Sequence, residues 1–126
     1  MAPLVHKELT VKVLGAAFAV HNSLGPGLLE SAYEGALCVE LAYRGLRFDR
    51  QAVFALEYRG EYVGAYIADL VVEDTVILEL KAVAQLSPVM DAQVINYLKL
   101  SGQPVGFLVN FAGLRVEWRR FVNGGG

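Results

Sequence analysis

Residues 68–81 read ADLVVEDTVILELK, and the rest of the chain is best interpreted outward from them. Two runs rich in Val, Ile and Leu flank an acidic turn, a pattern that predicts a β-hairpin. Three charged residues interrupt these apolar runs: Asp69 in the first strand, and Glu79 and Lys81 in the second. Because side chains alternate between the faces of a strand, Glu79 and Lys81 share one face.

Two carboxylates beside an ammonium group suit a divalent cation. Mg²⁺ takes oxygen ligands, typically one or two carboxylates with water and substrate phosphate. A lysine beside the ion can orient an attacking water or stabilise charge developing on phosphorus. The hairpin therefore predicts metal-assisted phosphodiester hydrolysis. The alternative is an exposed strand on which Glu79 and Lys81 form a surface ion pair and Asp69 is a charge at the sheet edge.

The length of the hairpin loop decides whether Asp69 can meet Glu79. A loop of three residues, 73–75, sets Asp69 opposite Glu79 on one face of the sheet. A loop of two residues would set Asp69 opposite Leu78 and turn its side chain to the other face. We predict the three-residue loop.

Composition predicts one domain spanning residues 1–126, large enough to bury a single core, with residues 123–126 as a disordered tail. Hydrophobic residues make up 55% of the chain and the mean hydropathy is +0.41. So apolar a chain has little polar surface to cover itself, and we expect an apolar self-association surface and a homo-oligomer.

Cellular location is addressed by three features of the sequence. No apolar run approaches the roughly 18 residues of a membrane-spanning helix. The N-terminus lacks the basic, apolar and small-residue layout of a secretory signal. Cys38 is the single cysteine, which excludes an internal disulfide and is expected to be a small core residue. Together these features predict a cytoplasmic protein.

The net charge is −2 and the isoelectric point is near 5.6. These values argue against a strongly basic nucleic-acid-binding surface. They do not exclude a nuclease, because carboxylates of a metal site lower the net charge and the ion restores positive potential locally. Weak or structure-dependent binding of nucleic acid is the expected consequence.

Two helices are predicted before the hairpin. The first covers residues 8–23, with Val11, Leu14, Phe18 and Leu24 near one apolar stripe. His21, near its end, either benefits from the helix dipole or contacts the active site. Glycine and proline in residues 24–27 break the chain, and a second helix runs over residues 28–44 to Gly45. Its apolar positions are Leu29, Tyr33, Leu37 and Leu41.

Glu30 lies in the first turn of the second helix and allows two interpretations. A carboxylate there is favoured by the helix dipole, so Glu30 could simply stabilise the start of the helix. Alternatively, the glycine-flanked turn aims Glu30 into a cleft as a further metal ligand. The sequence does not separate the two.

The strands are predicted over residues 46–58, 62–72, 76–81, 104–110 and 114–122. In the second of them, Asp69 alternates in step with Val63, Ala65 and Ile67, which predicts that Asp69 lies on an apolar face. A helix over residues 88–101 precedes the fourth strand, so the third and fourth strands are expected to be parallel. The expected fold is α/β (α+β), with a mixed central sheet flanked by helices in the order α-α-β-β-β-α-β-β.

The helix over residues 88–101 begins with Ser87 as its cap and Pro88 at its first position. It places Gln93 and Tyr97 four residues apart, on one face. Either Tyr97 packs with its apolar neighbours while Gln93 is solvated, or both side chains converge on the metal site and help to hold substrate phosphate or water.

The last strand carries Trp118 with three arginines, Arg115, Arg119 and Arg120. This group could meet nucleic acid by stacking and phosphate contact. A basic edge strand that discourages aggregation between sheets is the favoured interpretation.

The sequence resembles the PD-(D/E)XK nuclease superfamily in Asp69, in Glu79-Leu80-Lys81 and in the spacing of Gln93 and Tyr97, which is similar to the QxxxY element of its RecB-like exonuclease branch. More specifically, GLLESAY at residues 27–33 resembles the signature of the GxxExxY family. The flanking segments VHNSLGPG at residues 20–27, VILELKA at 76–82 and NYLK at 96–99 are similar to that family too. The resemblance extends from about residue 8 to residue 122.

The resemblance implies a nuclease core with Glu30, Asp69 and Glu79 around Mg²⁺ or Mn²⁺. Lys81 would be the catalytic lysine, and Gln93 and Tyr97 supporting catalytic residues. One departure is the proline that precedes the metal-binding aspartate in the superfamily, where this chain has Ala68. Two functions follow: a metal-dependent nuclease acting on DNA or RNA, or a catalytically latent nuclease-fold module acting in oligomeric assembly or nucleic-acid binding.

Overall fold

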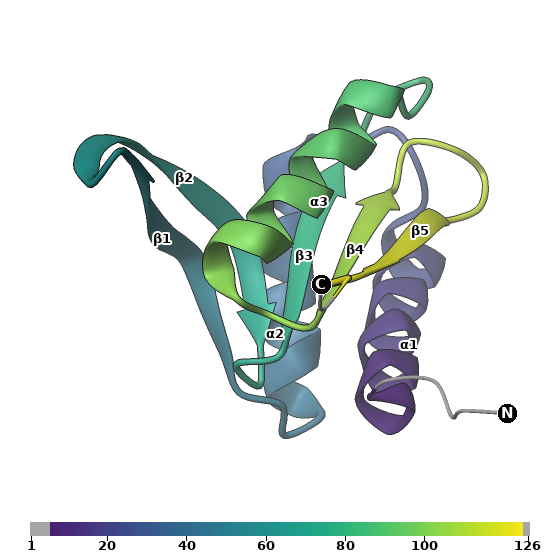
Figure 1. The fold of residues 1–126 in the computed structure, drawn as a ribbon. Helices are drawn as coiled ribbons and strands as arrows, with labels where there is room; N and C mark the ends of the chain where they lie inside the picture. Colours follow the sequence, from purple (N-terminus) through teal and green to yellow (C-terminus); the bar gives the residue numbers. More distant parts are fainter. Residues whose placement is uncertain (1–5, 125–126) are drawn as a thin grey trace, which may run out of the picture.

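The computed structural model describes residues 6–124 and contains three helices and five strands in that range (Figure 1). In chain order they are α1 (Lys7–Leu24), α2 (Glu30–Tyr43), β1 (Phe48–Tyr58), β2 (Glu61–Val72), β3 (Val76–Lys81), α3 (Pro88–Ser101), β4 (Val105–Asn110) and β5 (Glu117–Val122). The order and the types of these elements agree with the prediction. No helix among the described residues is long and apolar enough to span a membrane.

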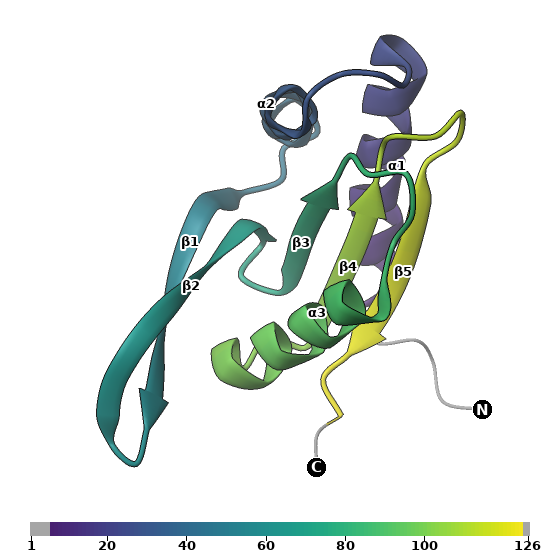
Figure 2. The ribbon, with the colours of Figure 1, turned by 90° about the horizontal axis from the view of Figure 1, so that it is seen from above.

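The five strands form one mixed sheet in the order β1-β2-β3-β4-β5. All neighbouring pairs are antiparallel except β3 and β4, which are parallel and joined through α3. Figure 2 shows α1 and α2 on one side of the sheet and α3 on the other. The predicted α/β class with a mixed central sheet is confirmed.

The hairpin between β2 and β3 has the predicted three-residue loop. Val72 pairs with Val76, and the register continues through Leu70 and Leu78. Glu73 and Asp74 take left-handed backbone conformations, with φ of 51° and 48°, which close the turn. This register sets Asp69 level with Glu79.

Helix α3 also begins and ends as predicted. Ser87 caps it, its side-chain oxygen accepting a hydrogen bond from the Met90 amide, and Gly102 ends it at a φ of 74°. Gly106 of β4 lies directly beneath this helix. A side chain at Gly106 would come within 2.9 Å of Val94, so glycine allows α3 to lie close to the sheet.

The core has one layer on each side of the sheet. The larger layer joins α1 and α2 to the sheet, and the smaller joins α3, through Leu98, to Tyr66, Val71 and Ile77. The predicted apolar stripe of α1 is wrong for three of its four members: Val11, Phe18 and Leu24 are exposed, and Leu14 packs against the core. The residues that face the sheet are mostly small, namely Val13, Ala16, Ala17 and Val20, because the helix packs closely there.

Three further predictions concern single residues. In α2, Tyr33, Leu37 and Leu41 are buried as expected, whereas Leu29 is exposed. Cys38 packs against the edge of the larger core layer and is half-buried. Asn123, at the start of the predicted disordered tail, is held by hydrogen bonds to the carbonyls of Leu98, Gln103 and Pro104. Residues 125 and 126 of that tail lie outside the described part of the chain.

The long β1–β2 ribbon changes the face that it buries halfway along its length. Leu70 packs in the larger core layer, yet Ala68, two residues away, packs in the layer under α3. On β1, Phe48 packs against the larger core layer and Ala52 against the layer under α3. The change falls where Gln51 adopts a left-handed φ of 55°.

The expectation that Asp69 lies on an apolar face of β2 is therefore wrong. Val63 and Ile67, which were expected to share its face, are 62% and 50% exposed. Asp69 instead lies at the point where the ribbon turns over, and this turn brings its carboxylate to the backbone of β3.

Candidate active site

Asp69 is held beside Glu79 by the backbone of β3. Its Oδ2 accepts a hydrogen bond of 2.8 Å from the amide of Leu80, the residue after Glu79. Beyond Leu70 and Leu78, β2 and β3 form no further paired positions, so the Asp69 side chain satisfies an amide that the sheet leaves open. The two carboxylates are thereby brought together on adjacent strands.

Glu79 is the most deeply buried acidic residue of the described chain, at 7% exposure. Its Oε1 has no hydrogen-bond partner among the described residues. Burial, followed by the negative charge of Asp69, raises the pKa of Glu79 from its ordinary value of 4.5 to about 8. This burial rules out the alternative of a surface ion pair between Glu79 and Lys81.

Lys81 lies half-buried at the end of β3. Burial dominates and raises the pKa of Glu79, Asp69 and Glu30, but the positive charge of Lys81 counteracts it at all three carboxyls. Within residues 6–124 its ammonium makes no ion pair with a carboxylate. Lys81 is therefore close enough to influence the acids while its amine is left available.

Glu30 is the first residue of α2 and is exposed. Burial of part of its carboxyl raises its pKa, and the charge of Asp69 raises it further. The structure thus brings Glu30 into the electric field of the acid pair. Its position in the first turn also satisfies the helix-dipole interpretation, so both interpretations remain compatible with the geometry.

Tyr97 of α3 lies close enough to the acid pair for their charges to affect its hydroxyl. Gln93 makes no side-chain hydrogen bond to any described residue and is exposed. Burial raises the pKa of Tyr97, and the charges of Glu79 and Asp69 add to this rise. The ring stacks on Tyr66 at 3.8 Å, and the Tyr66 hydroxyl donates to the Tyr97 carbonyl. These contacts fix Tyr97, and Gln93 is not fixed in the same way.

His21 and Tyr33 have structural roles. The buried His21 donates from Nε2 to the carbonyl of Gly113, which joins the end of α1 to the loop between β4 and β5. Tyr33 stacks on Phe111 at 4.7 Å and donates to the carbonyl of Gly25. The tyrosine of the segment at residues 27–33 thereby holds the turn that precedes Glu30.

Three polar residues next to the acids were not singled out by sequence. Gln51 bridges Asp69 and Glu34, with Nε2 at 3.5 Å from Asp69 Oδ1 and 2.8 Å from Glu34 Oε1. Asn110 holds the segment after Lys81, accepting from the Val83 amide and donating to its carbonyl. Asn110 could have been found as the polar end of an apolar strand, but nothing in the sequence marks Gln51 or Glu34.

The acids suit a divalent cation only in part. Asp69 and Glu79 offer carboxylate oxygens, one of them buried without a partner, and Mg²⁺ commonly needs only one or two carboxylates. No group of three or more His, Cys, Asp or Glu side chains within residues 6–124 is arranged to hold a metal. The two strand carboxylates therefore fit such an ion, and Glu30 would have to move closer to become a third ligand.

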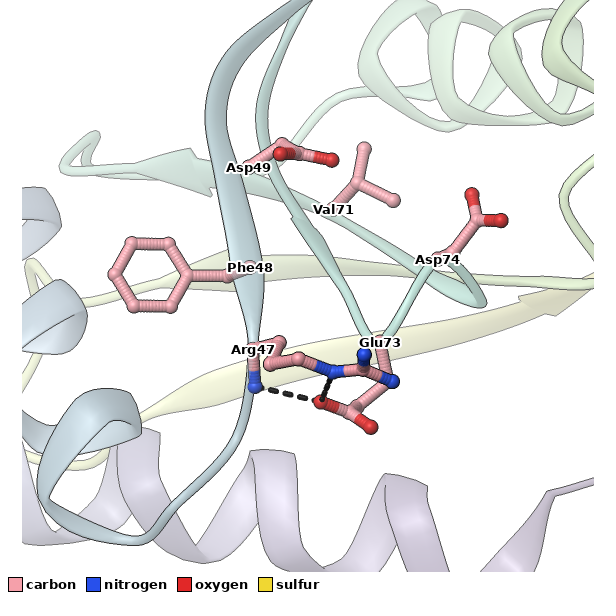
Figure 3. Close-up of a pocket in the computed structure, with 6 residues that line it drawn as sticks. All are labelled: Arg47, Phe48, Asp49, Val71, Glu73 and Asp74. Carbon is pink, nitrogen blue, oxygen red and sulfur yellow. Dashed lines mark hydrogen bonds and ion pairs between the residues drawn. The ribbon is translucent and has the colours of Figure 1, made fainter.

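Two pockets lie away from the acid pair. One, of 380 Å³, is lined by Arg47, Phe48, Asp49, Val71, Glu73 and Asp74 at the opposite end of the β2–β3 hairpin. Figure 3 shows Glu73 accepting two hydrogen bonds from Arg47, one from the backbone amide and one from the guanidinium. The second pocket lies between the end of α1 and Trp118. Neither pocket contains a candidate catalytic residue.

The basic group on β5 is partly engaged by the protein itself. Arg119 forms an ion pair of 2.6 Å with Asp91 of α3. Trp118 is 43% exposed and meets Phe107 edge-on. The contact with nucleic acid expected of this strand stays a prediction.

The fold and the acid pair place the protein among α/β proteins with a nuclease-like core. The model of the PD-(D/E)XK nuclease superfamily matches residues 7–121. That match covers most of the sequence, and the chain belongs to this superfamily.

Two solved structures share the fold. One is the crystal structure of SSO0001, with a TM-score of 0.53 and 15% identity; the match covers 92% of this chain and 61% of that one. The other is an alkaline exonuclease (LHK-Exo) from Laribacter hongkongensis, with a TM-score of 0.54 and 12% identity, covering 97% of this chain and 72% of that one. This chain thus spans less than two thirds of SSO0001. No curated protein sequence matches it.

Proposed function

We propose that the protein is a metal-dependent nuclease that hydrolyses phosphodiester bonds of DNA, or alternatively of RNA. The observation that carries the proposal is the buried carboxylate of Glu79, with one oxygen unpartnered, next to Asp69 and Lys81. A buried carboxylate with one oxygen left without a hydrogen bond is costly to stability and is typical of a functional site. Membership of a nuclease superfamily supports the same conclusion.

Each candidate residue receives a role in this proposal. Asp69 and Glu79 would hold Mg²⁺ or Mn²⁺, and Glu30, after moving closer, would complete the ligand set from α2. A bound ion of this kind activates water and neutralises charge on phosphate. Lys81 would donate hydrogen bonds from its ammonium group, either to orient the attacking water or to stabilise the charge developing on the phosphorane. Tyr97 and Gln93 support the substrate from α3, as in the QxxxY element that the sequence resembles.

The assignment to the GxxExxY family within the superfamily is part of the proposal. It is supported by the segment at residues 27–33, in which Tyr33 holds the turn and Glu30 starts the helix. We also propose that residues 1–126 act as one nuclease domain and that the protein works in the cytoplasm as a homo-oligomer.

The second candidate is a catalytically latent nuclease-fold module that acts in assembly or nucleic-acid binding. It is favoured by the exposure of Glu30 and by the lack of a three-ligand group in residues 6–124. The two candidates differ in whether metal binding and cleavage occur.

A cleavage assay tests the proposal. The substrates are plasmid, linear and single-stranded DNA and RNA, each with Mg²⁺ or Mn²⁺ and with a chelator. We expect metal-dependent cleavage that Asp69→Asn abolishes. Asp74→Asn is the matched control, because Asp74 is an exposed carboxylate in the hairpin loop bonded only to Gln103 among the described residues. If none of the four substrates is cleaved, with or without added metal, the nuclease proposal is refuted and the catalytically latent module is favoured.

A further inference from the structure

Gln51 is the one non-glycine residue in the interior of a strand, within residues 6–124, that has a left-handed backbone. A residue with a side chain in this conformation costs about 1 kcal/mol or more, and such strain persists only where other interactions fix it. On either side, Arg50 pairs with Leu70 and Ala52 with Ala68, whereas Gln51 itself is left out of the pairing opposite Asp69. The strain therefore falls next to a candidate metal ligand.

The side chain of Gln51 joins two elements that carry candidate ligands. Its Nε2 donates to Glu34 of α2 at 2.8 Å and to Asp69 of β2 at 3.5 Å. An amide nitrogen has two hydrogens, so one group can serve both carboxylates. The reverse orientation would place the amide oxygen against two acids, which fixes the assignment of nitrogen and oxygen.

The remaining oxygens of the two acids are also fixed. Arg50 pairs with Glu34 Oε2 at 2.8 Å, and the Leu80 amide donates to Asp69 Oδ2 at 2.8 Å. Glu34 lies one turn after Glu30 on the same face of α2. Gln51 therefore links the strand that carries Asp69 to the helix that carries Glu30.

We propose that Gln51 is a positioning residue that sets the orientation of Asp69, and its spacing from Glu30, for a bound divalent cation. This inference rests on the proposed function and adds the residue that holds the ligands from two different elements in register. Residues that orient metal ligands from behind typically contribute 10- to 100-fold to metal affinity. The hydrogen bonds from the Gln51 side chain to Glu34 and Asp69 offset the strain of the left-handed backbone at Gln51.

The test measures Mn²⁺ affinity by loss of the electron paramagnetic resonance signal of free Mn²⁺, with calorimetry for Mg²⁺. We expect Gln51→Ala to weaken binding by about 10- to 100-fold. Gln51→Gly removes the amide but relieves the backbone strain, so it should fold at least as well as Gln51→Ala and lose affinity equally. Gln103→Ala is the matched control, because Gln103 makes an amide–carboxylate contact of 2.9 Å to Asp74, away from the acids.

Activity gives a second, independent readout. At saturating Mn²⁺ the Gln51→Gly variant should recover cleavage close to the parent rate, because excess ion offsets a weaker affinity. A rate that stays low at saturating Mn²⁺ would contradict a role confined to metal binding. Unchanged Mn²⁺ affinity in Gln51→Gly, with binding abolished in Asp69→Asn, would overturn the inference and leave the proposed function standing. A parent protein that binds no metal would overturn both.

Discussion

The metal-free protein should lose stability as the pH rises, because of Glu79. The ordinary pKa of a glutamate is 4.5, and burial followed by the charge of Asp69 raises that of Glu79 to about 8. A carboxyl whose pKa is raised on folding keeps its proton longer in the folded state, so its stabilising effect is present below pH 4.5 and is lost as the pH rises to about 8. Each pKa unit corresponds to about 1.4 kcal/mol, which gives a loss of about 5 kcal/mol across this range and about 3 kcal/mol by pH 7.

The substitution Glu79→Gln isolates this effect, since the amide has nearly the same shape and does not ionise. We expect the variant to match the parent near pH 4 and to exceed its free energy of unfolding by about 3 kcal/mol at pH 7. Urea unfolding with a chelator at half-unit steps from pH 4 to pH 9 measures the difference. Glu61→Gln, at the exposed first residue of β2, is the control. A difference that stays constant with pH would refute the argument.

Mn²⁺ should restore the stability that the parent loses at higher pH and should leave the stability of Glu79→Gln unchanged. The ion requires the ionised carboxylate, so binding below about pH 8 releases the proton of Glu79 and affinity should rise about tenfold per pH unit. A Mn²⁺ affinity that is the same at pH 6 and pH 8 would contradict the role of Glu79 as a ligand.

Three further predictions follow from the same geometry. Lys81→Ala should lower the cleavage rate by roughly 100- to 1,000-fold in single-turnover assays with little change in DNA affinity, and equal losses of both would contradict its catalytic role. Asn110→Ala should lower the free energy of unfolding by about 1 to 3 kcal/mol in urea titrations, since it leaves the Val83 amide and carbonyl unpaired. The protein should be a homo-oligomer, most simply a two-fold dimer, in light scattering at high micromolar concentration; a monomer there would refute the apolar self-association surface.

The sequence predicted most of the fold because the signals were local. Of the two loop lengths considered for the β2–β3 hairpin, only the three-residue loop places Asp69 and Glu79 together, and the structure has that loop. Ser87 and Gly102 mark the ends of α3 by capping chemistry alone. Such features depend on neighbouring residues only, so sequence is sufficient for them.

The errors arise where packing between distant elements decides the outcome. The apolar stripe of α1 was assigned to its large residues, but a helix that lies close to a sheet presents Ala16 and Ala17 and leaves Phe18 at 40% exposure. The face of Asp69 was deduced from strict alternation along β2, which fails where the ribbon turns over at Gln51. A left-handed glutamine has no sequence signature, because glycine or asparagine is the usual residue there.

The turn in the ribbon also explains how Ala68 can replace the proline typical of the superfamily. Ala68 is fully buried under α3, and it pairs with Ala52 across the ribbon. A proline would remove a backbone donor from this ladder. In this chain the direction of the following aspartate is instead set by contacts outside its own backbone, from the Leu80 amide on one oxygen and from Gln51 on the other. The rigid residue before Asp69 is thus dispensable because neighbouring elements orient the carboxylate, and we therefore expect the loss of Gln51 to weaken metal binding more than folding.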